Sequence, residues 1–173
     1  MNKVTLKELF LAVCIISSLS ACYTSKIYVV RHAERQDDSA DTPLSEVGHQ
    51  RAKALSDSLY TKGIDSIFVT KYQRTKHTAQ PLAERLGKKS EIYDVKQTGS
   101  IVERLSKIKG KNVLVVGHSD TVLEIVKGLG TKPSIAKIEH NDYDNLFLVT
   151  VNKGLFGKKV TLKENTYGQK TLP

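Results

Sequence analysis

Three short apolar runs constrain the fold of this sequence most strongly, because basic side chains follow each of them. The runs and the basic residues that come after them are 27–30 before Arg31 and His32, 65–70 before Arg74, and 112–117 before His118. Short runs rich in β-branched residues are typical of strands buried on both faces of a parallel sheet. The carboxyl ends of parallel strands meet at one edge of the sheet, so we expect these basic side chains to share one crevice.

Amphipathic segments with helical spacing separate the apolar runs. We expect helices from Ser45 to about Gly63, over 74–86, over 98–110, and from Ser119 or Asp120 to Gly130. Because Pro81 lies inside the second of these segments, a kink or two consecutive short helices are expected there.

Weaker apolar segments complete the predicted sheet. A short strand is expected over 91–95, and two final strands over 145–151 and 157–162, joined around 152–154 as an antiparallel pair. Residues 131–144 are polar and are predicted to form a loop. The alternation of strands and helices predicts a single three-layer α/β/α domain with a mostly parallel sheet and an antiparallel edge strand.

The composition limits the classes of partner. A chain of 173 residues suits one domain, and its net charge of +9 is spread along the sequence without a dense basic block. Aromatic residues make up only 6% and Trp is absent, which argues against a nucleic-acid partner. The positive field favours an anionic substrate or anionic lipid head groups, and we expect a monomer.

The first 22 residues have the order of a bacterial export signal. Lys3 and Lys7 precede the apolar run 9–16, which is too short to span a bilayer, and small residues follow. Leu19-Ser20-Ala21-Cys22 resembles a lipobox, which predicts a lipoprotein signal peptide over 1–21 and a lipid anchor on Cys22. The functional domain is then 22–173, exported and tethered to a membrane on the periplasmic or outer side. A plain signal peptide with a chance cysteine at the cleavage point is the alternative.

The basic residues of the expected crevice suit phosphoryl chemistry. Guanidinium groups pair with phosphate oxygens through two parallel hydrogen bonds and stay charged at any relevant pH. A neutral imidazole can attack phosphorus while its other ring nitrogen is hydrogen-bonded to a backbone carbonyl. Two arginines and two histidines around one tetrahedral dianion would supply both positioning and charge stabilisation.

Three motifs carry a resemblance to a known family. They are Arg31-His32-Ala33-Glu34, the stretch 72–75 with Thr78-Ala79, and 116–119. In order and spacing these motifs resemble those of the histidine phosphatase (phosphoglycerate mutase-like) superfamily, in its small, minimal branch. The resemblance implies a phosphoglycerate mutase-like fold and no metal or organic cofactor. It also implies that His32 forms a phosphohistidine, while Arg31, Arg74 and His118 bind the phosphoryl group.

The positions of the candidate general acids differ from those in the family motifs. Larger acid phosphatases of the superfamily place Asp directly after the second histidine, where this chain has Ser119 and brings Asp120 one residue later. Mutase-like members carry a Glu after the second arginine motif, where this chain offers Asp94 or, as a weaker candidate, Glu91. We expect Asp94 to be the acid. The substrate is then a phosphomonoester or phosphohistidine, on a small molecule or a protein.

Four other functions were weighed. Acyl transfer by Ser119 would need a G-x-S-x-G turn, but the fifth position is Thr121. A metal ion held by His32 and His118 would be repelled by the nearby arginines, which argues against a metal site. Loss of activity in EDTA would support a metal site after all. A mutase-like phosphotransferase and a non-catalytic, surface-tethered module that binds phosphorylated ligands stay open as alternatives.

Overall fold

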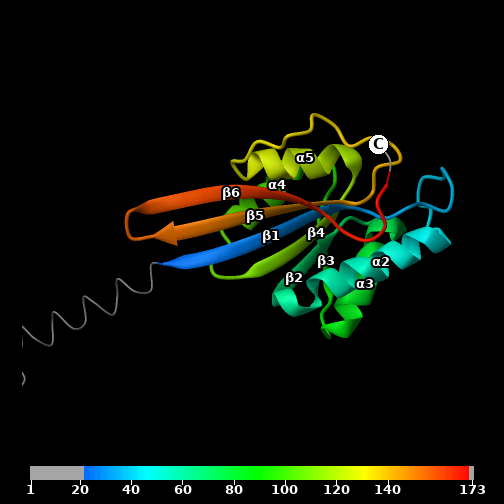
Figure 1. Ribbon diagram of the computed structural model, residues 1–173, viewed down its shortest axis with the longest axis horizontal. Helices are drawn as coiled ribbons and strands as arrows, with labels where there is room; N and C mark the ends of the chain where they lie inside the picture. Colours follow the sequence, from blue (N-terminus) through cyan, green and yellow to red (C-terminus); the bar gives the residue numbers. More distant parts are fainter. Residues whose placement is uncertain (1–21, 172–173) are drawn as a thin grey trace, which may run out of the picture.

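Six strands form one mixed sheet in the computed structural model, which describes residues 22–171 (Figure 1). The strands are β1 (Tyr23–Arg31), β2 (Ile64–Val69), β3 (Ser90–Ile92), β4 (Asn112–Gly117), β5 (Asn145–Gly154) and β6 (Gly157–Thr166). The helices are α2 (Glu46–Leu59), the short 3₁₀ helix η1 (Tyr60–Lys62), α3 (Gln73–Arg85), α4 (Thr98–Ser106) and α5 (Ser119–Gly128).

The sheet has the order β3-β2-β4-β1-β5-β6, and its two halves differ in direction. The first four strands run parallel, whereas β5 pairs antiparallel with both β1 and β6. Helices α2 and α3 cover one face and α4 and α5 the other (Figure 1). The predicted α/β/α domain, with its antiparallel pair at one end of the sheet, is therefore confirmed.

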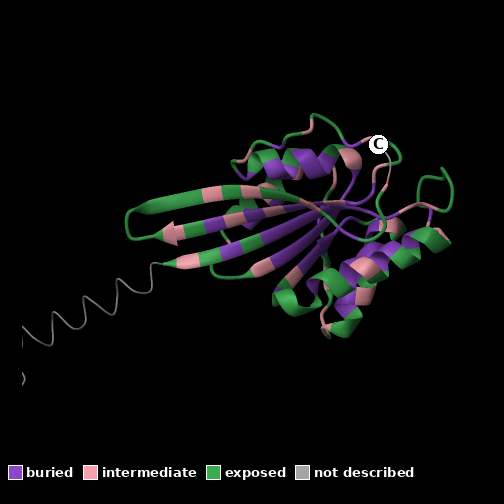
Figure 2. Ribbon diagram, viewed as in Figure 1, coloured by how far each residue is buried: buried purple, intermediate pink, exposed green. Residues whose placement is uncertain are grey.

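Alternate residues of the central strands fill two separate cores (Figure 2). Ile27 and Val29 of β1 pack toward α4 and α5, while Tyr28 and Val30 pack toward α2 and α3. All four are buried, as expected for a strand covered on both faces. This two-sided burial fixes the register of β1, since a slip by one residue would exchange the two faces.

Several local predictions are wrong in detail. Helix α3 runs through Pro81 as one helix, with Ala79, Leu82 and Ala83 packed against the sheet on both sides of the proline, which excludes two consecutive short helices. The β5–β6 turn lies at residues 155–156 instead of 152–154, because both strands extend beyond the core. The short strand β3 begins and ends earlier than expected.

A buried ion pair connects the end of β1 to α2 and to the C-terminal segment. The guanidinium of Arg51 in α2 contacts the carboxylate of Glu34, with Nη2 2.7 Å from Oε1. Its Nη1 also donates to the backbone carbonyls of Tyr167 and Gln169. Three segments distant in sequence are thus held together two residues beyond His32.

The predicted signal peptide, 1–21, lies outside the described residues, and Cys22, where they begin, has an exposed free thiol. Within 22–171 the structure contains no helix long and apolar enough to cross a membrane.

Close packing at Gly48 leads to a test of this junction. A Cβ added to Gly48 in α2 would lie 2.2 Å from the carbonyl oxygen of Glu34, which is backbone and cannot rotate away. We expect Gly48→Ala to lower the free energy of unfolding by about 1–3 kcal/mol, the usual cost of overpacking.

The control for this prediction is Gly99→Ala in α4, where an added Cβ has no neighbour within 4 Å. That substitution should leave the stability unchanged or raise it by up to about 1 kcal/mol. Urea unfolding measures both variants. Equal stability of the two would contradict the close contact between α2 and the segment after β1.

Candidate functional site

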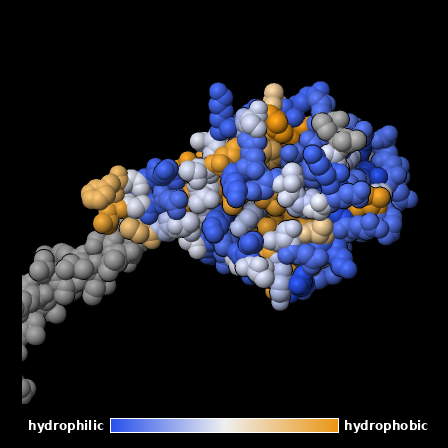
Figure 3. Space-filling view, in the orientation of Figure 1, coloured by the Kyte–Doolittle hydropathy of each residue, from blue (hydrophilic) through white to orange (hydrophobic). Residues whose placement is uncertain are grey.

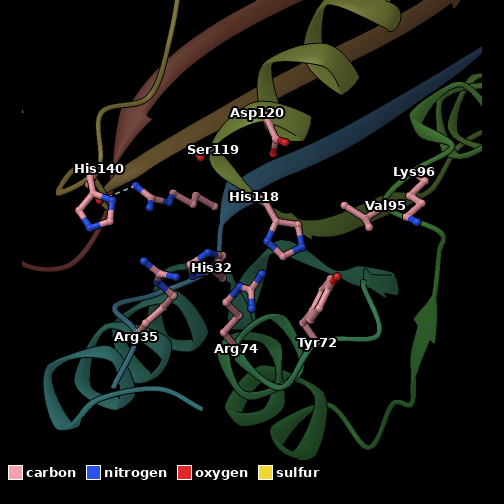
Figure 4. A pocket seen from close by; sticks show the side chains of 11 residues that line it. His32, Arg35, Tyr72, Arg74, Val95, Lys96, His118, Ser119, Asp120 and His140 are labelled. Atoms are coloured by element: carbon pink, nitrogen blue, oxygen red, sulfur yellow. Dashed lines mark hydrogen bonds between the residues drawn. The ribbon is translucent and has the colours of Figure 1, made fainter. Parts of the chain in front are cut away.

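A pocket of about 620 Å³ lies at the carboxyl ends of β1 and β4. The four basic residues expected to share a crevice, Arg31, His32, Arg74 and His118, all line it. Figure 4 shows the side chains of His32, Arg74 and His118 gathered in the pocket, with Asp120 on its α5 side. The structure therefore brings together the side chains that follow three separate strands.

The pairing of β1 with β4 places the two histidines side by side. Arg31 is opposite Gly117 in the parallel register, and the amide of His32 donates to the carbonyl of Gly117 at 2.9 Å. The imidazole rings of His32 and His118 then lie edge to face, with centroids 5.3 Å apart. Both side chains are buried.

The tautomer of His32 is fixed by the backbone. Its Nδ1 lies 2.8 Å from the carbonyl oxygen of Ala33, which can only accept a hydrogen bond. Nδ1 therefore carries the proton, and the lone pair of the neutral ring is on Nε2. This is the arrangement needed for nucleophilic attack by Nε2.

A chain of hydroxyl groups fixes His118 in the same way. The single hydroxyl proton of Thr75 is donated to a backbone carbonyl, such as that of Tyr72 at 2.9 Å. Thr70 Oγ1, 2.9 Å from Thr75 Oγ1, must then donate to it and accept from His118 Nε2 at 3.0 Å. His118 Nε2 therefore carries the proton of the neutral ring, and any second proton goes to Nδ1.

Burial keeps both imidazoles neutral. Desolvation lowers the pKa of His32 to about 2, assisted by the nearby His118 ring and by the charges of Arg31 and Arg74. Desolvation and then the Arg74 charge lower the pKa of His118 to about 4. An arriving dianion would offset the positive charges and favour protonation of His118.

Arg31 is held from behind by the loop between α5 and β5. Its Nη1 donates to the carbonyl oxygens of Glu139, His140 and Asp142 at 2.7 to 3.0 Å. The ring of Tyr143 lies beneath the guanidinium, with its centroid 4.1 Å from Cζ. This support fixes the direction of a buried cation whose Nε has no acceptor among the described residues.

Arg74 is supported by the loop between β1 and α2. Its Nη1 donates to the carbonyl of Ala40 at 2.9 Å, and its Cζ lies 4.4 Å from the centroid of the Tyr72 ring. Like that of Arg31, its buried Nε has no acceptor within residues 22–171. Both guanidiniums line the same pocket, and two cations at one pocket are suited to an anionic ligand.

The two candidate acids occupy different places. Asp94 lines an adjoining hollow with Tyr72 and Ile92, and its exposed carboxylate accepts from the amide of Lys96 and the side chain of Gln97. Asp120 lines the main pocket, and its charge raises the pKa of His118. Each carboxylate accepts a backbone amide nearby in sequence, Asp94 from Lys96 and Asp120 from Thr121, so the two differ in that Asp120 alone of them lines the main pocket.

Helix α5 begins at the pocket, although its N-cap differs from the prediction. The N-cap is His118 itself, whose amide donates to Thr121 Oγ1 at 2.9 Å, in place of Ser119 or Asp120. Ser119 therefore sits in the first turn and lines the pocket. The positive end of the helix dipole faces the space between the basic side chains.

Several pocket residues were not identified from the sequence. Arg35, Lys96 and His140 extend the basic lining, and Tyr72 and Tyr143 support the arginines. Arg35 directly follows the first motif, and this position in the sequence could have indicated that it lies at the pocket. The others come from loops whose positions depend on tertiary contacts. No group of three His, Cys, Asp or Glu side chains that could hold a metal ion occurs within 22–171.

Comparison with known proteins agrees with the fold and the motifs. Residues 27–98 match the model of the histidine phosphatase superfamily (branch 1). This match covers less than half of the chain and confirms the resemblance carried by the first two motifs. The sequence has no significant match among curated proteins.

Solved structures with the same fold include three informative examples. A mycobacterial glucosyl-3-phosphoglycerate phosphatase has a TM-score of 0.67 at 13% identity, covering 84% of this chain and 100% of its own. The protein histidine phosphatase SixA complexed with tungstate has a TM-score of 0.60 at 17% identity, covering 82% and 96%. Phosphoglycerate mutase from Plasmodium falciparum has a TM-score of 0.57 at 17% identity, covering 85% and 94%. At these identities the likeness establishes the phosphoglycerate mutase-like fold.

The lowered histidine pKa values predict how stability depends on pH. Below the unfolded-state pKa of 6.5 the unfolded chain binds protons that the folded chain does not, so stability is highest above that pH and falls on acidification. For His118, with a folded pKa of about 4, the loss between pH 7 and pH 5 is about 2 kcal/mol.

Urea unfolding at the two pH values tests this prediction. In His118→Asn the difference in unfolding free energy between pH 7 and pH 5 should shrink by that amount. His140→Asn, which removes an exposed imidazole at the same pocket, is the control. An unchanged pH dependence in His118→Asn would show that this ring takes up its proton in the folded state as readily as in water.

Proposed function

We propose that this chain is a phosphatase that transfers a phosphoryl group from its substrate to His32 and then to water. The observation that carries the proposal is the buried pair of neutral imidazoles, 5.3 Å apart, with two arginines lining the same pocket. Such a site binds a tetrahedral dianion and offers it an unprotonated nitrogen.

The first step is attack by Nε2 of His32 on phosphorus. A phosphorus–nitrogen bond forms, the phosphorus–oxygen bond to the leaving group breaks, and the electron pair leaves with that oxygen. The guanidiniums of Arg31 and Arg74 and the ring of His118 stabilise the charge on the transferred group. Because Nδ1 of His32 donates to Ala33, the positive charge that develops on the ring is partly dispersed into the backbone.

The second step restores the enzyme. Water attacks the phosphohistidine, the phosphorus–nitrogen bond breaks, and inorganic phosphate leaves with His32 neutral again. We assign the proton transfers to Asp120, which would protonate the leaving oxygen and then accept a proton from water. Its place beside His118 in the main pocket supports this role over Asp94.

The open, basic pocket supports a phosphorylated small molecule or a phosphoprotein as substrate. Arg35, Lys96 and His140 surround the entrance with positive or titratable groups and would contact further anionic parts of a ligand. Among proteins with this fold, one is named as a phosphatase of glucosyl-3-phosphoglycerate and another as a protein histidine phosphatase. We also propose that the chain is exported and lipid-anchored through Cys22, as the Leu19-to-Cys22 motif indicates.

The nucleophile is tested by a substrate panel. His32→Ala should lose at least about 10³-fold in kcat/KM toward every phosphorylated compound that the wild type hydrolyses, because no other group takes over the transfer. Wild type quenched in alkaline denaturant should carry one acid-labile, base-stable phosphate on His32, detected by mass spectrometry.

Three other results would argue against this function. Equal phosphate release by wild type and His32→Ala would exclude His32 as the nucleophile. Phosphate transfer to a second alcohol in preference to water would indicate the mutase-like alternative. Tight phosphate binding without any turnover, even in single-turnover conditions, would indicate the binding module.

The proton donor is tested by varying the leaving group. Asp120→Asn should lower kcat/KM for alkyl phosphates by about 10²–10⁴-fold, since an alkoxide needs protonation. The loss should be much smaller for p-nitrophenyl phosphate and phosphoramidate. Asp94→Asn is the matched control and should behave like wild type. The reverse pattern in these two variants would restore Asp94 as the acid.

A further inference from the structure

The turn between β5 and β6 exposes the two most solvent-accessible large apolar side chains in the described part of the chain. Leu155 is 65% exposed and Phe156 is fully exposed, and only these two residues join Gly154 to Gly157. Figure 3 shows an apolar cluster at the end of this hairpin, apart from the body of the domain. The core gains nothing from these side chains at this position.

Lysines surround this apolar turn. Lys153 precedes it and Lys158 and Lys159 follow it, and the sequence from 150 to 161 contains no Asp or Glu. An exposed apolar tip with a purely basic border is typical of segments that enter the head-group layer of an anionic membrane.

A second basic loop lies at the same end of the sheet. Lys109 and Lys111 flank Gly110, which donates to the side chain of Ser25 near the start of β1. The backbone amide of Lys26 also donates to the carbonyl of Lys111 at 3.2 Å. Both lysine side chains are exposed, so they add to the positive field around the hairpin.

The start of β1 lies against the base of the same hairpin. Tyr23 pairs with Lys153, and the residue before Tyr23 is Cys22, the predicted lipidation position. A lipid on Cys22 would leave no linker between the membrane and the strand. The hairpin would then be held at the membrane surface with its apolar turn toward the lipid.

We propose that the β5–β6 turn is a membrane contact, with Leu155 and Phe156 inserted among lipid head groups and the surrounding lysines bound to anionic phosphates. The occupant of this surface is thus an anionic bilayer. The domain then has two neighbouring points of attachment, the anchor at Cys22 and the hairpin turn, both at the end of the sheet opposite the pocket.

This orientation has a consequence for the substrate, which rests on the proposed phosphatase function. Strand β1 leads from the membrane end at Tyr23 to the pocket at Arg31. Its nine residues span about 26 Å at about 3.3 Å per residue. The pocket is thus separated from the attached end of the domain by the length of β1, which favours substrates dissolved in the aqueous compartment over head groups of the same membrane.

The absence of Trp from the sequence makes a fluorescence test direct. In the full chain, Phe156→Trp places a single Trp at the turn, and Val47→Trp places one at an exposed position of α2 as the control. Each protein is reconstituted with vesicles of phosphatidylethanolamine and phosphatidylglycerol, with and without brominated acyl chains.

We expect the emission of Trp at position 156 to shift to shorter wavelength on vesicles and to be quenched by the brominated lipids. Trp at position 47 should show neither effect. The shift should weaken on phosphatidylcholine vesicles, and adding Lys158→Glu and Lys159→Glu to the Phe156→Trp chain should weaken it on anionic vesicles as well.

Three results would contradict the proposal, because the fluorescence of Trp at position 156 reports on the turn alone. Sedimentation of the chain with vesicles while Trp at position 156 stays unquenched would overturn the proposal. So would equal quenching at both positions, or a blue shift without vesicles that accompanies dimer formation. None of these outcomes depends on enzymatic activity, so the proposed phosphatase function is tested separately.

Discussion

The site depends first on the parallel pairing of β1 with β4. This pairing sets Arg31 opposite Gly117, so the residues that follow each strand, His32 and His118, leave the sheet at the same level. Apolar side chains on both faces of each strand hold the register, and a shift by one residue would bury the wrong set. The register of β1 against β4 therefore determines both the packing of the core and the placement of the imidazoles.

Burial then determines the chemistry that these imidazoles can perform. Because desolvation and two guanidinium charges disfavour the protonated rings, His32 presents an unprotonated Nε2 at any ordinary pH. The cost is an accumulation of positive charge around a buried site, with N–H groups of both arginines left without acceptors. A bound phosphoryl group would offset this positive charge, so the free protein is arranged for an anion.

The sequence was most informative where chemistry follows a strongly buried strand. Runs such as 27–30 and 112–117 could be placed in a parallel sheet, and the topology rule for such sheets then predicted the convergence of His32, His118 and Arg74. The fold could be predicted for the same reason.

Features that arise from loop conformation could not be predicted in this way. Asp94 was predicted to be the acid from its position in the sequence, and the loop after β3 places it in the adjoining hollow instead of the main pocket. The three carbonyl groups that accept from Arg31 belong to a loop without hydrophobic periodicity, so their position could not be predicted from the sequence. The hairpin turn at 155–156 was misplaced because β5 and β6 continue past the core, where hydrophobic spacing no longer marks a strand.

A crystal structure of the protein with orthovanadate, which adopts the trigonal-bipyramidal geometry of phosphoryl transfer, tests the role of the pocket directly. We expect a bond between vanadium and Nε2 of His32, with the equatorial oxygens contacting Arg31, Arg74 and His118. Vanadate bonded to Oγ of Ser119, or bound away from both histidines, would contradict it.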